Sequence, residues 1–209
     1  MSPISPRVHS RTVTPLIAPT AAELATVLPP VLAARDRTDL TRSGDLAGVL
    51  IVLFDHAGKS HLVLTKRTEY PGHHSGEVSL PGGRYEASDP DLRATALRET
   101  HEEVGIAPGA LQTLGALDDV ETRVSGFTVQ PWIAHHPGGR PAMTPDPGEV
   151  ARVMEVPLAD LLAADQLLPP DPQFGVLRYP LLGEDVWGLT ARILRTFLEI
   201  MRDATAPVA

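Results

Sequence analysis

The sequence contains no cysteine. A disulfide framework, a thiolate nucleophile and a cysteine-ligated zinc site are therefore all excluded. Aromatic residues make up only 4% of the chain, whereas apolar residues of all kinds make up 43%. Over 209 residues this apolar content is enough for one hydrophobic core. We expect that core to consist mainly of Leu, Val, Ala and Ile.

Basic residues are scarce relative to acidic ones. The chain has 18 Lys and Arg against 26 Asp and Glu, which gives a formal net charge of −8. Proteins that bind nucleic acids generally present a basic surface, so this balance argues against a nucleic-acid partner. An anionic small molecule would have to be attracted by local arginines, histidines or metal ions, because the overall field repels it.

Two kinds of targeting segment are also missing. No apolar run reaches the length of a membrane-spanning helix, and the N-terminus lacks the basic and apolar stretches of a secretory signal. We therefore expect a cytoplasmic protein that does not contact membranes. The sequence leaves its oligomeric state open between monomer and homodimer.

The hydrophobic pattern predicts strands interrupted by helices, after an N-terminal extension. Residues 1–45 form this extension, which we expect to be irregular apart from short helical turns in 21–34 that break at Pro29 and Pro30. Residues 46–205 form the main domain. Its expected helices and strands occupy two sets of ranges. The helices are 91–104, 157–164 and 186–202, and the strands are 47–54, 61–66, 77–80, 111–120, 127–135, 150–156 and 173–182.

An acidic stretch in the helix expected at 91–104 is the most informative segment. Glu99, Glu102 and Glu103 stand at i, i+3 and i+4, so they share one helix face within a sector of about 100°. Neighbouring like charges destabilise a helix unless a cation lies between them. Mg²⁺ and Mn²⁺ prefer carboxylate oxygens and are often shared with substrate phosphates. The alternative interpretation is an acidic face that simply meets water.

The residues around this acidic face favour a metal site over a solvated face. A tight turn at Pro81-Gly82-Gly83 precedes the helix, and Asp91 stands where it can cap the first turn. Gly105 follows the last turn, where a residue with positive φ is favoured. A glycine turn, a capped start and a glycine stop together predict a preformed metal site.

These residues resemble the Nudix box, whose usual form is G-x5-E-x7-R-E-U-x-E-E-x-G-U, with U an aliphatic residue. Gly83 would begin the motif, and residues 98–106 would complete it. The sequence departs from the usual form in three places: Asp89 replaces Glu, the next spacer is one residue longer, and Thr100 replaces an aliphatic residue. The resemblance implies an α/β fold, a Nudix-type α/β/α sandwich with a mixed sheet. It also implies an enzyme that hydrolyses a diphosphate linked to another group.

Residues 63–83 resemble a second motif, found in the coenzyme A pyrophosphatases of the Nudix superfamily. That motif is close to L-L-T-x-R-S-x-x-L-R-x-H-x-G-Q-x-x-F-P-G-G, and the spacing is kept here without a gap. Gly72, Glu77 and Leu80 replace its second arginine, its glutamine and its phenylalanine. The lost arginine and the added carboxylate both weaken a site for a polyanion. The resemblance still implies coenzyme A or an acyl derivative as the substrate, cleaved to 4′-phosphopantetheine and adenosine 3′,5′-bisphosphate. The alternatives are another nucleoside diphosphate derivative, such as ADP-ribose or a dinucleotide, and a non-catalytic nucleotide-binding module.

The resemblance implies particular roles for residues of the site. Mg²⁺ or Mn²⁺ would be held by three carboxylates and one carbonyl, from Glu99, Glu103, Glu102 and Gly83. Glu102 is either a ligand or the general base, and the sequence does not decide between these roles. Arg98 would orient a carboxylate, and Glu149 would be a base supplied by a distant loop, with a surface position as the alternative for each. Contacts to the substrate are expected from four further residues, Arg67, His74, Arg84 and Gly82.

Overall fold

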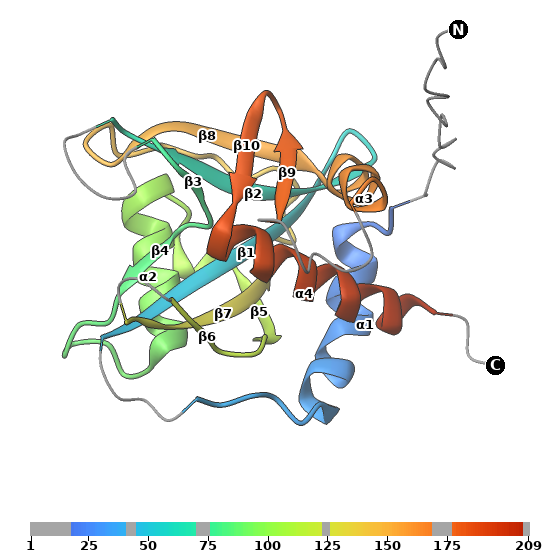
Figure 1. The fold of residues 1–209 in the computed structure, drawn as a ribbon, viewed down its shortest axis with the longest axis horizontal. Helices are drawn as coiled ribbons and strands as arrows, with labels where there is room; N and C mark the ends of the chain where they lie inside the picture. Colours follow the sequence, from blue (N-terminus) through green and yellow to red (C-terminus); the bar gives the residue numbers. More distant parts are fainter. Residues whose placement is uncertain (1–17, 41–44, 70–75, 123–125, 169–176, 207–209) are drawn as a thin grey trace, which may run out of the picture.

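The structure is a computed structural model, and it describes residues 18–40, 45–69, 76–122, 126–168 and 177–206. A mixed sheet lies between two helical layers (Figure 1), which confirms the expected α/β/α sandwich. The strands of this sheet are β1 (Leu46–His56), β2 (Lys59–Arg67), β3 (Val78–Ser79), β4 (Gly82–Arg84), β5 (Gln112–Ala116), β6 (Val120–Glu121), β7 (Thr128–His135) and β8 (Val150–Pro157). The helices are α1 (Ala21–Ala34), α2 (Leu92–Val104), α3 (Leu158–Gln166), α4 (Gly188–Thr205) and the short 3₁₀ helix η1 (Pro108–Ala110).

The centre of the sheet is β1, which pairs parallel with β7 and antiparallel with β2. Along the main path the strand order is β3-β2-β1-β7-β5, while β8 pairs with β2 and β6 with β7. β1 and β2 diverge beyond their hairpin, and β3 and β4 lie between them, β3 on β2 and β4 on β1 (Figure 1). This divergence brings the glycine turn of β4 next to α2.

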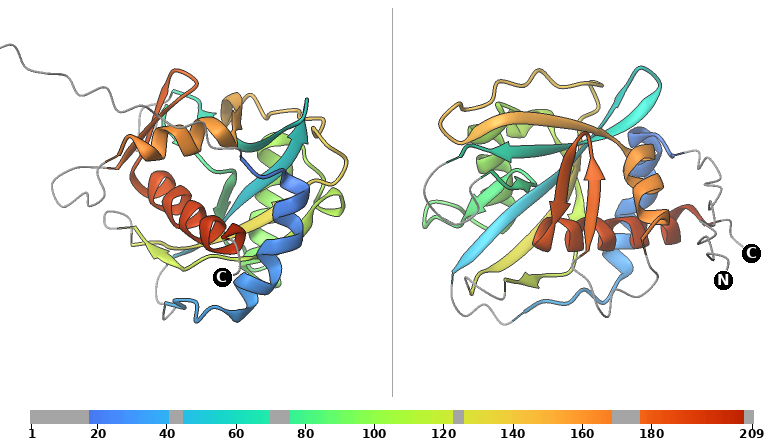
Figure 2. Two further views of the ribbon diagram at one scale, coloured as in Figure 1. Left: turned by 90° about the vertical axis from the view of Figure 1, so that its right-hand side faces the viewer. Right: turned by 45° about the horizontal axis from the view of Figure 1, so that its top comes forward.

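Each face of the sheet has its own hydrophobic core. Successive side chains of a strand point to opposite faces, and β1 shows this clearly. Leu50 and Val52 pack with residues of α2, whereas Ile51 and Leu53 pack with residues of α1, α3 and α4. The two helical layers are visible on either side of the sheet in Figure 2. None of the helices in the described ranges is both long and apolar enough to cross a membrane.

The prediction that the first helix breaks at Pro29 and Pro30 is wrong. α1 runs through both prolines for 14 residues, beginning at a capping box formed by Thr20 and Glu23. Each proline removes one backbone donor, but the helix places Leu24, Leu28 and Leu32 in the core on one face. Burial of these leucines outweighs the missing hydrogen bonds. The segment expected as an extension thus contributes a helix to the main core.

The strand expected at 111–120 and the last helix also differ from expectation. The strand expected at 111–120 is interrupted between β5 and β6, because Asp118 and Asp119 bind the segment after α1. Asp118 accepts from Arg35 at 2.6 Å, and Asp119 accepts from Arg37 at 2.5 Å. The last helix begins at Gly188, two residues later than expected, because the preceding residues form a hairpin of β9 (Arg178–Leu181) with β10 (Glu184–Trp187). The strand expected at 173–182 lies partly outside the described residues.

Candidate active site

Helix α2 carries the three glutamates and is fixed at both ends. Asp91 caps its start by accepting from the backbone N–H of Ala94 at 2.8 Å, and Gly105 ends it with φ 78°. Glu99 and Glu103 lie one turn apart, with side chains 16% and 3% exposed. Glu102 differs from both, because its side chain is 56% exposed. Two of the three carboxylates are therefore withdrawn from water.

The glycine turn packs directly on these two carboxylates. A side-chain carbon at Gly83 would lie 2.5–2.6 Å from the carboxylate atoms of Glu99, so a larger residue there would displace that carboxylate. Gly82 has φ 147° and donates its N–H to Glu103 Oε2 at 3.3 Å. The turn thus brings backbone close to both glutamates, and the absence of side chains makes that approach possible.

Arg98 connects most of the acidic groups around α2. Its Nη1 donates to Glu99 Oε1 and to Glu102 Oε2, each at 2.9 Å. Its Nε and Nη2 donate to the two oxygens of Asp89, each at 3.0 Å, and Nη2 also donates to the carbonyl of Arg84 at 3.0 Å. These charge-assisted bonds fix the orientation of Glu99 and hold Glu102 toward solvent.

Asp89 is the residue of this network that the sequence analysis did not assign to the site. Its carboxylate is buried and accepts from Arg98, from the hydroxyl of Thr95 at 2.9 Å and from the N–H of Glu86 at 3.1 Å. The hydrogen bonds from Arg98 hold the pKa of Asp89 at about 2, against the desolvation caused by burial. Its place in the Nudix-box pattern was the signal that could have identified it.

Replacing this carboxylate gives a first testable prediction. Asp89→Asn should lower the free energy of unfolding by about 2 kcal/mol or more at pH 7, because Arg98 loses a buried charged partner. Since the pKa of Asp89 in the folded state, about 2, is below its usual value, this stabilisation is present above the ordinary Asp pKa of about 3.9. It is lost as the pH falls toward 2.

Urea unfolding between pH 7 and pH 3 measures this difference. The gap between the parent and Asp89→Asn should be largest at neutral pH and should shrink below about pH 4. Asp185→Asn is a suitable control, because Asp185 forms an ion pair with Arg178 on the exposed surface of β10. That control should change stability by less than about 0.5 kcal/mol. Equal effects of the two substitutions would show that the Asp89 network is not important for stability.

Arg67 and Glu149 lie beside Glu103. Arg67 Nη1 is 3.7 Å from Glu103 Oε1, and the carbonyl of Glu149 accepts from the N–H of Thr68 at 3.0 Å. The loop before Glu149 is also tied to α2, because the N–H of Asp146 donates to the carbonyl of Glu103 at 3.0 Å. The structure therefore brings residues from β2, α2 and the 136–149 loop to one place.

The electrostatics of this place disfavour two bare carboxylates. Burial raises the pKa of Glu103 to about 7, and the charges of Glu149 and Glu99 add to this effect, while Arg67 and the N–H of Gly82 oppose it. Burial also raises the pKa of Glu99, and the charges of Glu102 and Glu149 add to it, against Arg98. A bound cation would stabilise the charged form of both groups.

A divalent cation fits Glu99 and Glu103, but the full set of expected ligands is not assembled. In the described part of the chain, no group of three or more His, Cys, Asp or Glu side chains is arranged to hold a metal ion. Glu102 is bound by Arg98 instead. Mg²⁺ commonly uses only one or two carboxylates and completes its shell with water and substrate phosphate, so Glu99 and Glu103 would be the residues to hold it.

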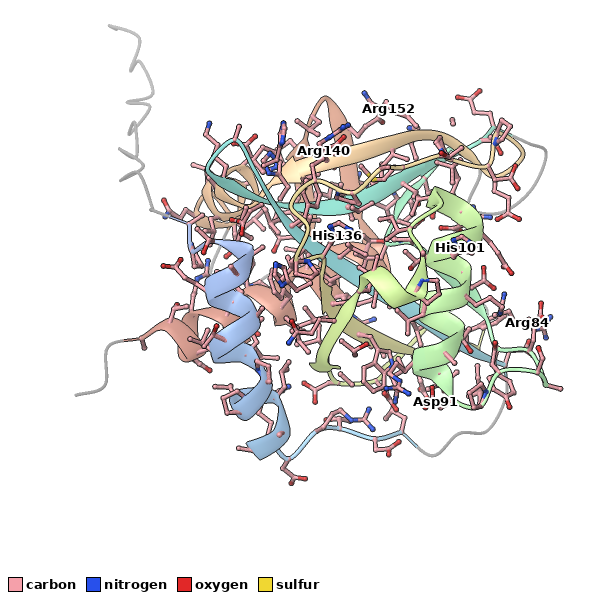
Figure 3. The ribbon with its side chains drawn as sticks, turned by 180° about the vertical axis from the view of Figure 1, so that it is seen from behind. Arg84, Asp91, His101, His136, Arg140 and Arg152 are labelled. Carbon is pink, nitrogen blue, oxygen red and sulfur yellow. The ribbon has the colours of Figure 1, made fainter. Side chains whose placement is uncertain are left out.

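Of the four residues expected to contact the substrate, only two lie beside Glu103. Arg67 and Gly82 lie at Glu103, as described above. Arg84 lies at the outer edge of the molecule (Figure 3). The side chain of Arg84 is 65% exposed and forms an ion pair with Asp45. His74 lies outside the described residues.

Comparison with known proteins identifies the family. Residues 45–175 match the family model described as the NUDIX domain. The chain belongs to the Nudix family. Among its curated relatives, the Nudix hydrolase NudL of Enterobacter sp. (strain 638) is 36% identical over 146 residues, which cover 64% of this chain and 71% of the relative. NudL of Salmonella paratyphi B is 38% identical over 139 residues, with the same coverage of both chains.

Solved Nudix structures share the fold at lower identity. An Ap4A hydrolase from C. elegans, solved as a binary complex, superposes with a TM-score of 0.53 at 19% identity and covers 77% of this chain and 99% of its own. The Nudix domain of NrtR from Shewanella oneidensis, solved with ADP ribose, gives 0.51 at 18% identity and covers 82% and 97%. These similarities support the mixed-sheet sandwich of a Nudix hydrolase.

Proposed function

We propose that this Nudix hydrolase is a metal-dependent pyrophosphohydrolase of coenzyme A or its acyl derivatives. The products would be a 4′-phosphopantetheine species and adenosine 3′,5′-bisphosphate. The observation that carries the reaction is the pair of carboxylates of Glu99, partly buried, and Glu103, buried, which pack on the glycine turn with Arg67 beside Glu103. The observation that favours coenzyme A is the motif at 63–83, which keeps the spacing of coenzyme A pyrophosphatases.

Each residue of the site has a proposed part in the reaction. Mg²⁺ or Mn²⁺ at Glu99 and Glu103 would neutralise phosphate charge and lower the pKa of the attacking water. Arg67 would pair with a substrate phosphate next to Glu103. Glu149 would accept the proton of the water, with Glu102 as the alternative base. The carbonyl of Gly83 would be a further ligand, because the turn presents backbone at this point.

A different nucleoside diphosphate derivative is the second candidate substrate. The backbone N–H of Arg67 donates to the carbonyl of Glu77 at 3.0 Å, so the carboxylate that replaces the motif's glutamine is adjacent in the ladder to the expected phosphate contact. Added negative charge disfavours the most anionic substrates. ADP-ribose, which lacks the 3′-phosphate of coenzyme A and is less anionic, would be affected less; a dinucleotide with a longer phosphate chain would gain no such advantage. A non-catalytic module is disfavoured, because such a protein has no need to keep Glu99 and Glu103 in surroundings that raise the pKa of both carboxyl groups.

A substrate panel separates these alternatives. We expect kcat/KM with Mg²⁺ or Mn²⁺ to be highest for coenzyme A and acetyl-coenzyme A, when compared with dephospho-coenzyme A, ADP-ribose and diadenosine tetraphosphate. Product masses should show cleavage within the diphosphate. A higher kcat/KM for ADP-ribose or the dinucleotide would overturn the coenzyme A proposal and support the second candidate. Absence of turnover with every compound would support the binding module.

A further inference from the structure

The side chain of Arg84 points away from the carboxylates of Glu99 and Glu103. A side-chain carbon at Gly83 would contact Glu99 of α2, and successive side chains of a strand point to opposite faces. The pairing of β4 with β1 gives the same direction. Gly83 is opposite Gly48, and a side-chain carbon added at Gly48 would lie 2.3 Å from the carbonyl oxygen of Leu92 in α2. Arg84 therefore belongs to the sheet face opposite α2, so it does not meet a phosphate held at Glu99 on the α2 face.

On that opposite face, Arg84 lies over an aromatic ring. Its Cζ is 5.5 Å from the centroid of Phe127, the residue before β7, and its Nη2 forms an ion pair with Asp45. Asp45 neutralises the positive charge, which makes the guanidinium a poor partner for a second anion. Most of the Arg84 side chain, 65%, is nevertheless open to solvent. The arrangement presents a flat, charge-compensated and accessible surface.

We propose that Arg84 and Phe127 form a stacking platform for the nucleobase of the substrate. The proposal rests on the proposed function, since it takes the substrate to be a nucleoside diphosphate derivative. Nucleobases stack on aromatic rings and on guanidinium planes, and this contact does not need a net charge.

The position of the platform fits a ligand that spans two faces. Gly83 and Arg84 are consecutive, so their Cα atoms are about 3.8 Å apart. Among the described strands β4 pairs only with β1, and its first two residues have no side chains. The other edge of β4 carries the N–H of Gly82, which bonds Glu103, and the carbonyl of Arg84, which accepts from Arg98. A ligand with its diphosphate at Glu99 and Glu103 would pass around these contacts to place its base on Arg84. The structure thus separates phosphate recognition from base recognition.

Binding of adenosine and of ADP without metal tests the platform, because adenosine carries no phosphate. Chemical-shift titration by NMR would measure both dissociation constants. We expect Arg84→Ala to weaken both ligands by about tenfold, which is within the range measured for stacking on one base. Arg84→Lys should weaken both as much, because lysine keeps the charge and loses the plane. Arg93→Ala on the exposed surface of α2 should change neither.

Phe127 supplies an independent arm of the same test. Phe127→Ala should weaken adenosine binding, and Phe127→Tyr, which keeps the ring, should restore it. In turnover experiments, Arg84→Lys should raise KM and leave kcat within about twofold, since the platform does not touch the reacting atoms. Wild-type affinity for adenosine in Arg84→Ala would overturn the platform. So would weakened ADP binding in Arg84→Ala that Arg84→Lys restores, because a charge contact to phosphate would then explain it.

The two proposals fail in different ways. A chain that binds adenosine through Arg84 and Phe127 but leaves coenzyme A intact keeps the platform and loses the coenzyme A assignment. A chain that hydrolyses coenzyme A with unchanged KM in Arg84→Lys keeps the assignment and loses the platform.

Discussion

Glu103→Gln should lower kcat on the preferred substrate on the order of 10³-fold, because the amide no longer offers a charged oxygen to the metal. The substitution keeps the size of the side chain, so packing against Gly82 and Arg67 is preserved. Glu103 is 3% exposed, and a neutral amide removes the cost of burying a charge there. The variant should therefore fold normally, with a thermal midpoint without metal equal to or above that of the parent.

The matched control for this prediction is Glu199→Gln on α4. Glu199 is 58% exposed and pairs only with Arg195 in the ion pairs described for it, far along the chain from the site. Glu199→Gln should leave kcat unchanged. Isothermal titration calorimetry should also show that Mn²⁺ binds more weakly to Glu103→Gln than to Glu199→Gln. Undiminished turnover and Mn²⁺ affinity in Glu103→Gln would remove Glu103 from the metal site.

Gly83→Ala is the second substitution with a large expected effect. The new methyl group would lie 2.5–2.6 Å from the carboxylate atoms of Glu99, well inside normal contact distance, so the carboxylate or the turn must move. A displacement near 1 Å at a catalytic group costs about 10²-fold in rate. We therefore expect kcat to fall by about that factor, with a smaller change in overall stability, since Glu99 is only partly buried.

Gly109→Ala supplies the control for added methyl groups. Gly109 lies in η1, and a side-chain carbon there would meet no atom within 4 Å. The activity of Gly109→Ala should match that of the parent. If Gly83→Ala kept full activity as well, the close contact between the turn and Glu99 would have no functional role.

The local features of the site could be predicted from the sequence, because they depend on residues close together in the chain. The i, i+4 spacing of Glu99 and Glu103 places both on one face of α2, whatever surrounds the helix. The cap at Asp91 and the stop at Gly105 are likewise decided by local hydrogen bonds and by φ, and both are present. The same reasoning predicts β1 and β2, whose apolar patterns are strong.

What the sequence did not predict depends on contacts between distant segments. Glu102 shares the helix face with its neighbours, yet Arg98 draws it toward solvent through a network that includes Asp89. The direction of Arg84 follows from the pairing of β4 with β1, which no local pattern reveals. α1 continues through Pro29 and Pro30 because tertiary burial of its leucines exceeds the local cost.

Metal-dependent cleavage of coenzyme A can be tested by mass spectrometry of its products after incubation with the parent protein, with and without Mg²⁺ or Mn²⁺. We expect a 4′-phosphopantetheine and adenosine 3′,5′-bisphosphate in equal amounts, formed only when the cation is present and not formed when a chelator is added. Intact coenzyme A under all conditions would contradict the substrate assignment. Cleavage that continues in the presence of chelator would contradict the metal site at Glu99 and Glu103.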